Sequence, residues 1–145
     1  MRVDAFKIAD YAEIEMSNGL GLEHWGLKGG IFPTLTMMEK AGTYYTVRDE
    51  GKVILIGGYF EFIEGVCEVS FYPSISFVEK PLAGYKLLKP FMEDLKVMFR
   101  RVQSHCIADE RFIKFAESFG FKQEGILRRF SHSGADHVMM AIVGE

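Results

Sequence analysis

The fold of this chain is decided by residues 109–121, which read DERFIKFAESFGF. Asp109 has the short acceptor side chain of a helix N-cap, and Gly120 is the residue type that ends helices in the left-handed conformation. Between them, apolar residues recur at helical spacing. This predicts a helix whose inward face consists of Phe112, Phe115, Ala116 and Phe119.

Strand-like segments lie on both sides of this helix. Residues 102–108 are short and apolar enough for a strand before it. After it, residues 121–130 and 137–143 read as two strands, with Phe121 anchoring the first of them to the core. Residues 131–135 form the turn between these strands, because Gly134 and its polar neighbours favour one.

A long amphipathic helix is expected upstream. Apolar residues recur three and four positions apart across residues 82–102, which is the spacing of one buried helical face. Pro90 interrupts this pattern, and we expect it to kink the helix or to mark a restart. The inward positions are Leu82, Tyr85, Leu88, Phe91, Met92, Leu95, Met98, Phe99 and Val102.

The first forty residues predict one strand and two helices. Residues 2–8 alternate apolar and polar, as a strand does, and Asp10 is expected to cap a short helix over 10–16. Residues 19–33 are glycine-rich and loop-like. The second helix is expected to have Thr34 or Thr36 as its cap and to end at Gly42.

Three strands are expected in the middle of the chain, at residues 43–47, 52–63 and 66–72, forming an antiparallel meander. Gly57 and Gly58 predict a bulge in the second strand. Alternation puts Glu68 and Tyr72 on one face of the third. The whole order is β-α-α-β-β-β-α-β-α-β-β, which predicts a mixed α/β sheet.

Composition limits the function classes. The 145 residues predict one domain over 1–145, and nearly half are apolar, as in a folded globular protein. A net charge of −3 without long single-sign runs argues against nucleic-acid or membrane binding. The two cysteines have no CxxC spacing, so we expect neither a disulfide framework nor a cysteine metal site. Without a visible signal peptide, we expect a cytoplasmic protein.

The element order and the ending resemble the GNAT superfamily of N-acetyltransferases. The closest likeness is the helix of residues 109–121 running into Gly120-Phe121, followed by Glu124-Gly125 and Arg128. Met139 and Met140 continue it in the last strand. The resemblance implies a GNAT-like acyl-CoA N-acyltransferase fold and transfer of acetyl from acetyl-CoA to a small-molecule or protein amine.

The resemblance also implies a place for acetyl-CoA. In GNAT proteins a glycine-rich loop and the following helix N-terminus hold the pyrophosphate. Here that place, residues 80–86, reads KPLAGYK without the Arg/Gln-x-x-Gly-x-Gly/Ala pattern. The pantetheine arm is expected in a V-shaped opening between segments 66–72 and 102–108. The implied cofactor contacts are Phe71, Tyr72, Pro73, Ser74, Lys80, Ala83, Gly84 and Tyr85.

Acetyl transfer needs a base that takes a proton from the amine. The resemblance implies Glu68 as this base, assisted by a water, Tyr72 or His105; the alternatives are a solvated strand carboxylate and a histidine at the core edge. Many GNAT members have a tyrosine four residues before the glycine of Gly-Phe, where this chain has Ala116.

Other polar residues are candidates for the acceptor side. The resemblance implies that the loop carrying His24 and Trp25 lines the acceptor, although an aromatic there could equally cover the core. Glu61, on the preceding strand, is a further candidate. His132 and His137 flank the last turn without a third ligand, so we expect exposed turn residues and no metal site.

A second reading stays open. The segments Ile56-Gly57-Gly58 and Gly65-Val66-Cys67 also look like the short GNAT-like proteins of tailed podophages, some of them internal virion core proteins. This resemblance implies a non-catalytic structural or interaction protein, located in the host cytoplasm or the virion, with other virion proteins as partners. On either reading, exposed apolar residues on a sheet edge would favour a homodimer.

Overall fold

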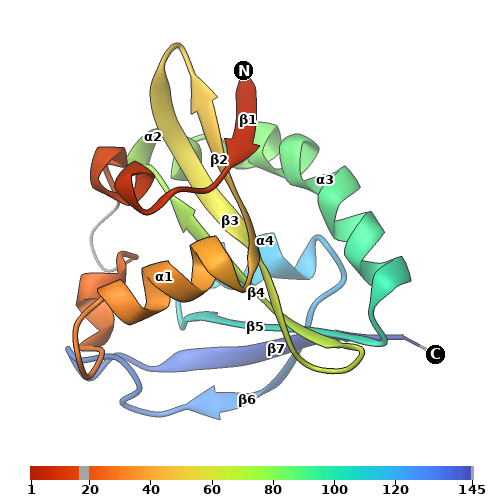
Figure 1. The fold of residues 1–145 in the computed structure, drawn as a ribbon. Helices are drawn as coiled ribbons and strands as arrows, with labels where there is room; N and C mark the ends of the chain where they lie inside the picture. The colour runs from red at the N-terminus through yellow and green to blue at the C-terminus, as the bar shows by residue number, and fades with distance from the viewer. Residues whose placement is uncertain (17–19, 145) are drawn as a thin grey trace. The chain divides into compact units, whose positions relative to one another are not determined.

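The computed structural model describes residues 1–16 and 20–144, with the side chains in them except that of His24. Seven strands are ordered β1-β2-β3-β4-β5-β7-β6 (Figure 1). The elements are β1 (Arg2–Ala5), η1 (Ile8–Glu13), η2 (Leu22–Trp25), α1 (Phe32–Lys40), β2 (Thr43–Asp49), β3 (Lys52–Ile63), β4 (Val66–Pro73), α2 (Ile75–Val78), α3 (Pro81–Met98), β5 (Arg101–Ile107), α4 (Glu110–Glu117), β6 (Lys122–Leu127) and β7 (His137–Val143).

The mixed α/β sheet and the predicted order are confirmed, with three local differences. The first predicted helix, over 10–16, is a short 3₁₀ turn, η1, and the segment 19–33, predicted as a loop, contains a second 3₁₀ turn, η2. A four-residue helix, α2, was not predicted. The chain contacts divide into two units, one of Met1–Phe60 and Val69–Lys80, the other of Glu61–Glu68 and Pro81–Glu145. That the two units act as the single domain predicted for 1–145 stays a prediction.

The first unit is held together by an apolar core under the 3₁₀ turns and α1. Nine buried side chains form it, and they come from η1, η2, α1, β2, β3 and β4, together with the residue after β1. Burying large side chains from so many elements fixes the short 3₁₀ turns, which could not persist alone. The members are Phe6, Tyr11, Leu22, Leu35, Met38, Tyr44, Val53, Ile56 and Tyr72.

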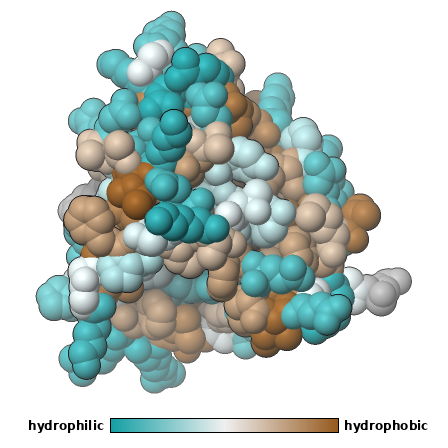
Figure 2. Space-filling model, viewed as in Figure 1, coloured by the Kyte–Doolittle hydropathy of each residue, from teal (hydrophilic) through white to brown (hydrophobic). Residues whose placement is uncertain are grey.

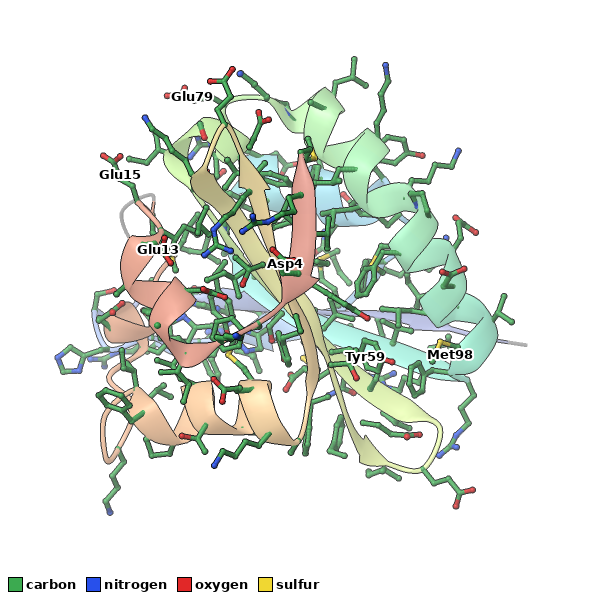
Figure 3. The ribbon with its side chains drawn as sticks, turned by 45° about the horizontal axis from the view of Figure 1, so that its top comes forward. Asp4, Glu13, Glu15, Tyr59, Glu79 and Met98 are labelled. Carbon is green, nitrogen blue, oxygen red and sulfur yellow. The ribbon has the colours of Figure 1, made fainter. Side chains whose placement is uncertain are left out.

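Asp10 is a buried carboxylate and not the N-cap that the sequence predicted. Lys7 occupies the cap position of η1, and its backbone N–H donates to Asp10 Oδ2 at 3.0 Å. The same oxygen accepts from Thr46 Oγ1 at 2.8 Å, and Oδ1 accepts from Arg48 at 2.9 Å. Asp4 and Glu13 carry the exposed carboxylates near Arg48 (Figure 3).

The start of α1 also differs from the prediction. The helix begins at Phe32, with Ile31 at the cap position and no side-chain cap, so the caps predicted at Thr34 or Thr36 are wrong. Pro33 lies in the first turn, where its fixed φ suits a helix and its missing N–H has no intrahelical partner to lose.

The bulge predicted at Gly57 and Gly58 is not found in the pairing of β3 with β2. Both glycines pair regularly with β2, and the register shift lies between Val47 and Arg48. The glycines are required by packing instead. A Cβ on Gly57 would overlap the ring of Phe71, and one on Gly58 would overlap the Thr43 carbonyl oxygen.

In the second unit, α3 continues across Pro90 without a restart. Leu88, Met92 and Leu95 are buried as predicted, but Leu82 and Met98 are 67% and 57% exposed, contrary to the prediction. The buried stripe of α3 is therefore narrower than the apolar pattern of its sequence. Apolar and polar residues are interspersed over the face of the molecule drawn in Figure 2.

The segment that decides the fold forms as predicted. Asp109 caps α4 by accepting from the backbone N–H of Arg111 at 2.9 Å. Gly120 has a φ of +103°, which favours glycine, and Phe121 is buried beyond it. Phe119 is buried as expected, whereas Phe112, Phe115 and Ala116 are only half-buried and Ile113 is the fully buried residue of the helix.

The last strands complete this unit. β5 pairs with β7 over seven residue pairs, and β7 pairs with β6, all antiparallel (Figure 1). β6 is shorter than the predicted 121–130, because the chain turns at Arg129, whose φ is +53°. The turn itself is closed as expected, with Gly134 N–H donating to the Ser131 carbonyl at 2.8 Å.

Candidate functional site

Glu68 lies at the end of the parallel pairing between β4 and β5. The register joins Val66, Cys67 and Glu68 to Arg101, Val102 and Gln103, while β4 continues to Pro73 and β5 to Ile107. Glu68 is half-buried, and its burial raises the pKa of the carboxyl group. A carboxylate with a raised pKa holds a proton more readily than a solvated one, which suits general base chemistry.

His105 is paired with a second histidine. Its Nδ1 lies 3.1 Å from Nδ1 of His137, so one ring donates and the other accepts. Alternation explains the contact, because His105 lies opposite Met139 and His137 is two residues from Met139 on the same face. Phe130 packs edge-on against His105, with the ring centres 4.9 Å apart.

The environment of His105 favours its uncharged ring. Burial, and then the neighbouring His137, lowers the pKa of His105 to about 4. His137 is 3% exposed, so the prediction of an exposed turn residue is wrong for His137. It is confirmed for His132. Strand alternation could have revealed the contact of His105 with His137 only if the register of β5 and β7 were known, and the sequence alone does not give that register.

We expect the His105–His137 pair to make folding stability depend on pH. The pKa of His105 falls from the usual 6.5 in the unfolded chain to about 4 in the folded one, so between these values the unfolded state binds more protons. Stability should therefore fall as pH decreases from 6.5 to 4, by about 3 kcal/mol in all.

The measurement is urea unfolding at a series of pH values. His105→Asn should flatten the profile over this window, whereas His132→Gln, at an exposed histidine, should leave it unchanged. A His105→Asn profile as steep as that of wild type would contradict the assignment.

The place expected to hold a pyrophosphate is the start of α3. Its first turn contains no acidic residue, Ala83 is exposed and Gly84 is buried. The first N–H groups of an 18-residue helix have no intrahelical partner and attract anions. Tyr85 is stacked on Phe119, with 5.2 Å between the ring centres. Its ring therefore takes part in packing within the second unit.

The other predicted cofactor contacts lie in the first unit. Phe71 lies beside Gly57, and Tyr72 is 4% exposed with its ring edge-on to Tyr11 at 6.3 Å. Ser74 Oγ caps α2 by accepting from Phe77 N–H, and its own N–H donates to the Ile54 carbonyl at 2.9 Å. That N–H is therefore already used by the fold. Pro73 ends β4, and Lys80 is exposed.

No protein-family model matches the chain, and no curated protein matches it significantly. Solved structures do match along their full lengths. An N-acetyltransferase from Staphylococcus aureus Mu50 has a TM-score of 0.73 at 17% identity, with 98% of this chain and 97% of that chain covered. A ribosomal-protein-alanine N-acetyltransferase from Brucella melitensis has a TM-score of 0.71 at 18% identity, with 99% of each covered.

A third structure, a putative phosphinothricin N-acetyltransferase, has a TM-score of 0.75 at 14% identity and covers 99% of this chain and 98% of its own. An acetyltransferase of the GNAT family from Streptococcus pneumoniae has a TM-score of 0.71 at 17% identity, again with 99% of each chain covered. The fold is the GNAT fold. At these identities the likeness establishes the fold alone.

On this GNAT fold, the predicted catalytic residues are distributed unevenly. Glu68 and His105 are on neighbouring strands of the second unit, whereas Tyr72 belongs to the core of the first. The residues that the sequence reasoning missed are His137 and Phe130, which surround His105. Ala116, in place of the GNAT tyrosine, is half-buried on α4.

The predicted acceptor residues of the GNAT fold also belong to different units. Trp25 is half-buried in η2, and the His24 side chain lies outside the described residues. Tyr11 anchors this turn, because its hydroxyl donates to Glu23 at 2.8 Å and accepts from the Leu22 N–H at 2.7 Å. Glu61 instead accepts from the Gly65 N–H at 2.8 Å in the β3–β4 turn.

The described part of the chain, residues 1–16 and 20–144, has no group of three His, Cys, Asp or Glu side chains that could hold a metal. None of its helices is long and apolar enough to cross a membrane. Cys67 and Cys106 are free, and burial raises the pKa of both thiols, to about 12 and about 11. Both are therefore thiols at neutral pH and not activated nucleophiles.

Proposed function

We propose that this protein is a GNAT N-acetyltransferase that transfers acetyl from acetyl-CoA to an amine. The observation that carries the proposal is the match, over the whole chain, to structures named as N-acetyltransferases. The half-buried carboxyl of Glu68 supports it with a group of suitable chemistry at the end of the β4–β5 pairing.

In the proposed reaction, Glu68 accepts a proton from the acceptor ammonium, directly or through a water. The amine nitrogen then attacks the thioester carbonyl carbon, forming the amide C–N bond as the C–S bond breaks, and it releases its second proton to solvent. The leaving thiolate takes up a proton from solvent. Burial of Glu68 favours its role, because a raised pKa brings proton affinity closer to that needed at neutral pH.

The start of α3 fits a pyrophosphate on the chemistry of its backbone. Leu82 and Ala83 supply N–H groups without an intrahelical acceptor in a turn without acidic side chains, and Lys80 and Lys86 supply nearby charge along the chain. Pro81 lies at the first helical position, where its missing N–H removes no intrahelical hydrogen bond. Residues 80–86 lack the glycine pattern of the GNAT pyrophosphate loop, and this favours the alternative, a non-catalytic GNAT-fold phage protein. The comparisons with solved structures do not support that alternative.

Thermal unfolding with and without acetyl-CoA tests this proposal. A ligand at a hundred times its dissociation constant stabilises the folded state by about 2.7 kcal/mol. We expect a raised Tm with acetyl-CoA and none with acetate at equal ionic strength. Unchanged Tm at millimolar acetyl-CoA would favour the non-catalytic alternative.

Release of CoA thiol, measured with a panel of amines, then tests the chemistry. The panel should include alanine-containing peptides and phosphinothricin, since two of the similar structures are named as a ribosomal-protein-alanine and a putative phosphinothricin N-acetyltransferase. Glu68→Gln should keep the Tm shift and lose at least about a hundredfold in transfer rate. Glu64→Gln, at an exposed turn carboxylate, is the matched control.

A further inference from the structure

The free edge of β1 has an unusual self-complementary pattern. β1 is the first strand in the sheet order, and in the described part of the chain it pairs with β2 alone. All four of its residues are exposed. An edge strand with exposed backbone groups is a template on which another strand can pair.

The backbone groups on this edge are identified by the register with β2. Phe6 N–H donates to the Tyr44 carbonyl at 2.9 Å, so Phe6 and Tyr44 form a hydrogen-bonded pair. Such pairs alternate along antiparallel strands. Arg2 and Asp4 therefore direct their backbone groups to β2, and Val3 and Ala5 direct theirs to the free edge.

The side chains divide in the same alternation. Arg2 and Asp4 are on one face, 2.7 Å apart between Nε and Oδ2. Met1, Val3 and Ala5 are on the other, and Met1 and Val3 are 73% and 54% exposed. Tyr45 of β2, opposite Ala5, is also 39% exposed on this apolar face.

We propose that β1 pairs with β1 of a second copy of this chain, antiparallel and symmetric about Val3. Val3 then exchanges backbone hydrogen bonds with Val3 of the partner subunit. Arg2 lies opposite Asp4 of the partner subunit, and Asp4 opposite Arg2 of the partner subunit, so two attractive pairs form on one face. The apolar residues Met1, Val3 and Ala5 meet their counterparts on the other.

Charge selects this register over its neighbours. The outward backbone groups belong to odd-numbered residues, so pairing can shift only by two residues. One shift places Asp4 opposite Asp4 of the partner subunit, and the other places Arg2 opposite Arg2 of the partner subunit. Both are repulsive, because like charges directly opposite each other destabilise a sheet. The symmetric register alone makes both cross-strand charge pairs attractive.

The other terminal strand in the order, β6, is less suited to such pairing. Its register with β7 shifts between Gln123 and Gly125, and an irregular strand matches a partner poorly. Both oxygens of Glu124 accept from Arg101, at 2.9 and 2.6 Å, so this charge is already satisfied within the chain. Four residues per strand make a small interface, and the β1 dimer is accordingly a weak one.

Sedimentation velocity, from micromolar to millimolar protein, tests the proposal. Wild type should associate reversibly to a dimer. Arg2→Asp and Asp4→Lys should each weaken the dimer about tenfold or more, because symmetry introduces every like-charge pair twice. An equimolar mixture of the two variants should form a heterodimer of near wild-type affinity. Lys122→Glu on β6 is the control and should leave the association unchanged.

A cross-link gives a second test that does not depend on charge. The two Val3 Cα atoms would be about 5.5 Å apart in a hydrogen-bonded antiparallel pair, within reach of a disulfide. Val3→Cys should therefore oxidise to a covalent dimer. Ala5→Cys, on the same face, would lie opposite Met1 of the partner subunit and should not. A wild-type monomer throughout, association unaffected by Arg2→Asp, or equal cross-linking at both positions would overturn the proposal.

Discussion

Gly58→Ala will destabilise the folded protein by about 3 kcal/mol, measured as a lower urea midpoint. Gly58 lies in the middle of β3, opposite Tyr44 of β2. A Cβ there would overlap the backbone oxygen of Thr43 and lie 2.8 Å from Cγ of Tyr44. Because the first obstacle is backbone in a paired strand, rotating a side chain cannot relieve the overlap.

Gly125→Ala is the matched control, since Gly125 is also a strand glycine but a Cβ there would meet nothing within 4 Å. We expect it to be neutral or slightly stabilising, because alanine restricts the unfolded chain more than glycine does. If both substitutions cost the same, the cost at position 58 would come from a general effect of alanine in a strand and not from close packing.

Asp10→Ala should be nearly as damaging, at about 3 kcal/mol. Asp10 is 7% exposed and accepts hydrogen bonds from the Lys7 N–H, Thr46 and Arg48. Removing its carboxylate leaves the fully buried Thr46 hydroxyl and the Lys7 N–H without this acceptor. Glu13→Ala is the control, because Glu13 lies at the same 2.9 Å from Arg48 but its side chain is 51% exposed.

The same residue should contribute to acid unfolding. Burial alone would raise the pKa of Asp10, but the hydrogen bonds from Lys7, Thr46 and Arg48 outweigh it and leave the pKa below its usual 3.8. Its contribution is therefore present above that pH and is lost as pH falls through the lower folded value. In urea unfolding at low pH, Asp10→Ala should lose this part of the acid dependence and Glu13→Ala should keep it.

Much of the fold could be predicted because local signals agreed with the packing. Asp109 and Gly120 bracket α4 in both sequence and structure, and the strand expected over 52–63 is β3 with the same bounds. Such signals act within a few residues of themselves, so the sequence carries them directly.

The misjudged elements depend on distant partners. Asp10 looks like a cap until β2 supplies Thr46 and Arg48. Gly58 looks like a bulge until its regular pairing with Tyr44 of β2 is known. His137 looked exposed because it follows a polar turn, yet β5 brings His105 against it. Each error came from reading a residue by its chain neighbours where packing across the sheet determines its role.

The candidate site was predictable only in part. Glu68 was chosen through the family resemblance, and its half-buried position and raised pKa are consistent with the proposed role. The same resemblance implied that Tyr72 assists this base, but the structure buries Tyr72 in the core, where alternation alone could not place it. Solvent access follows from tertiary packing, and periodicity shows only which side of a strand a residue is on.

The anchored turn η2 also provides a built-in optical probe. Trp25 is the only tryptophan of the chain and lies two residues after Glu23. The carboxylate of Glu23 accepts a hydrogen bond from the Tyr11 hydroxyl. Indole emission from the folded protein therefore originates entirely from this turn. Any local loosening there, whether by heat, by a bound molecule or by loss of the Tyr11 hydroxyl, would appear in the fluorescence without an added label.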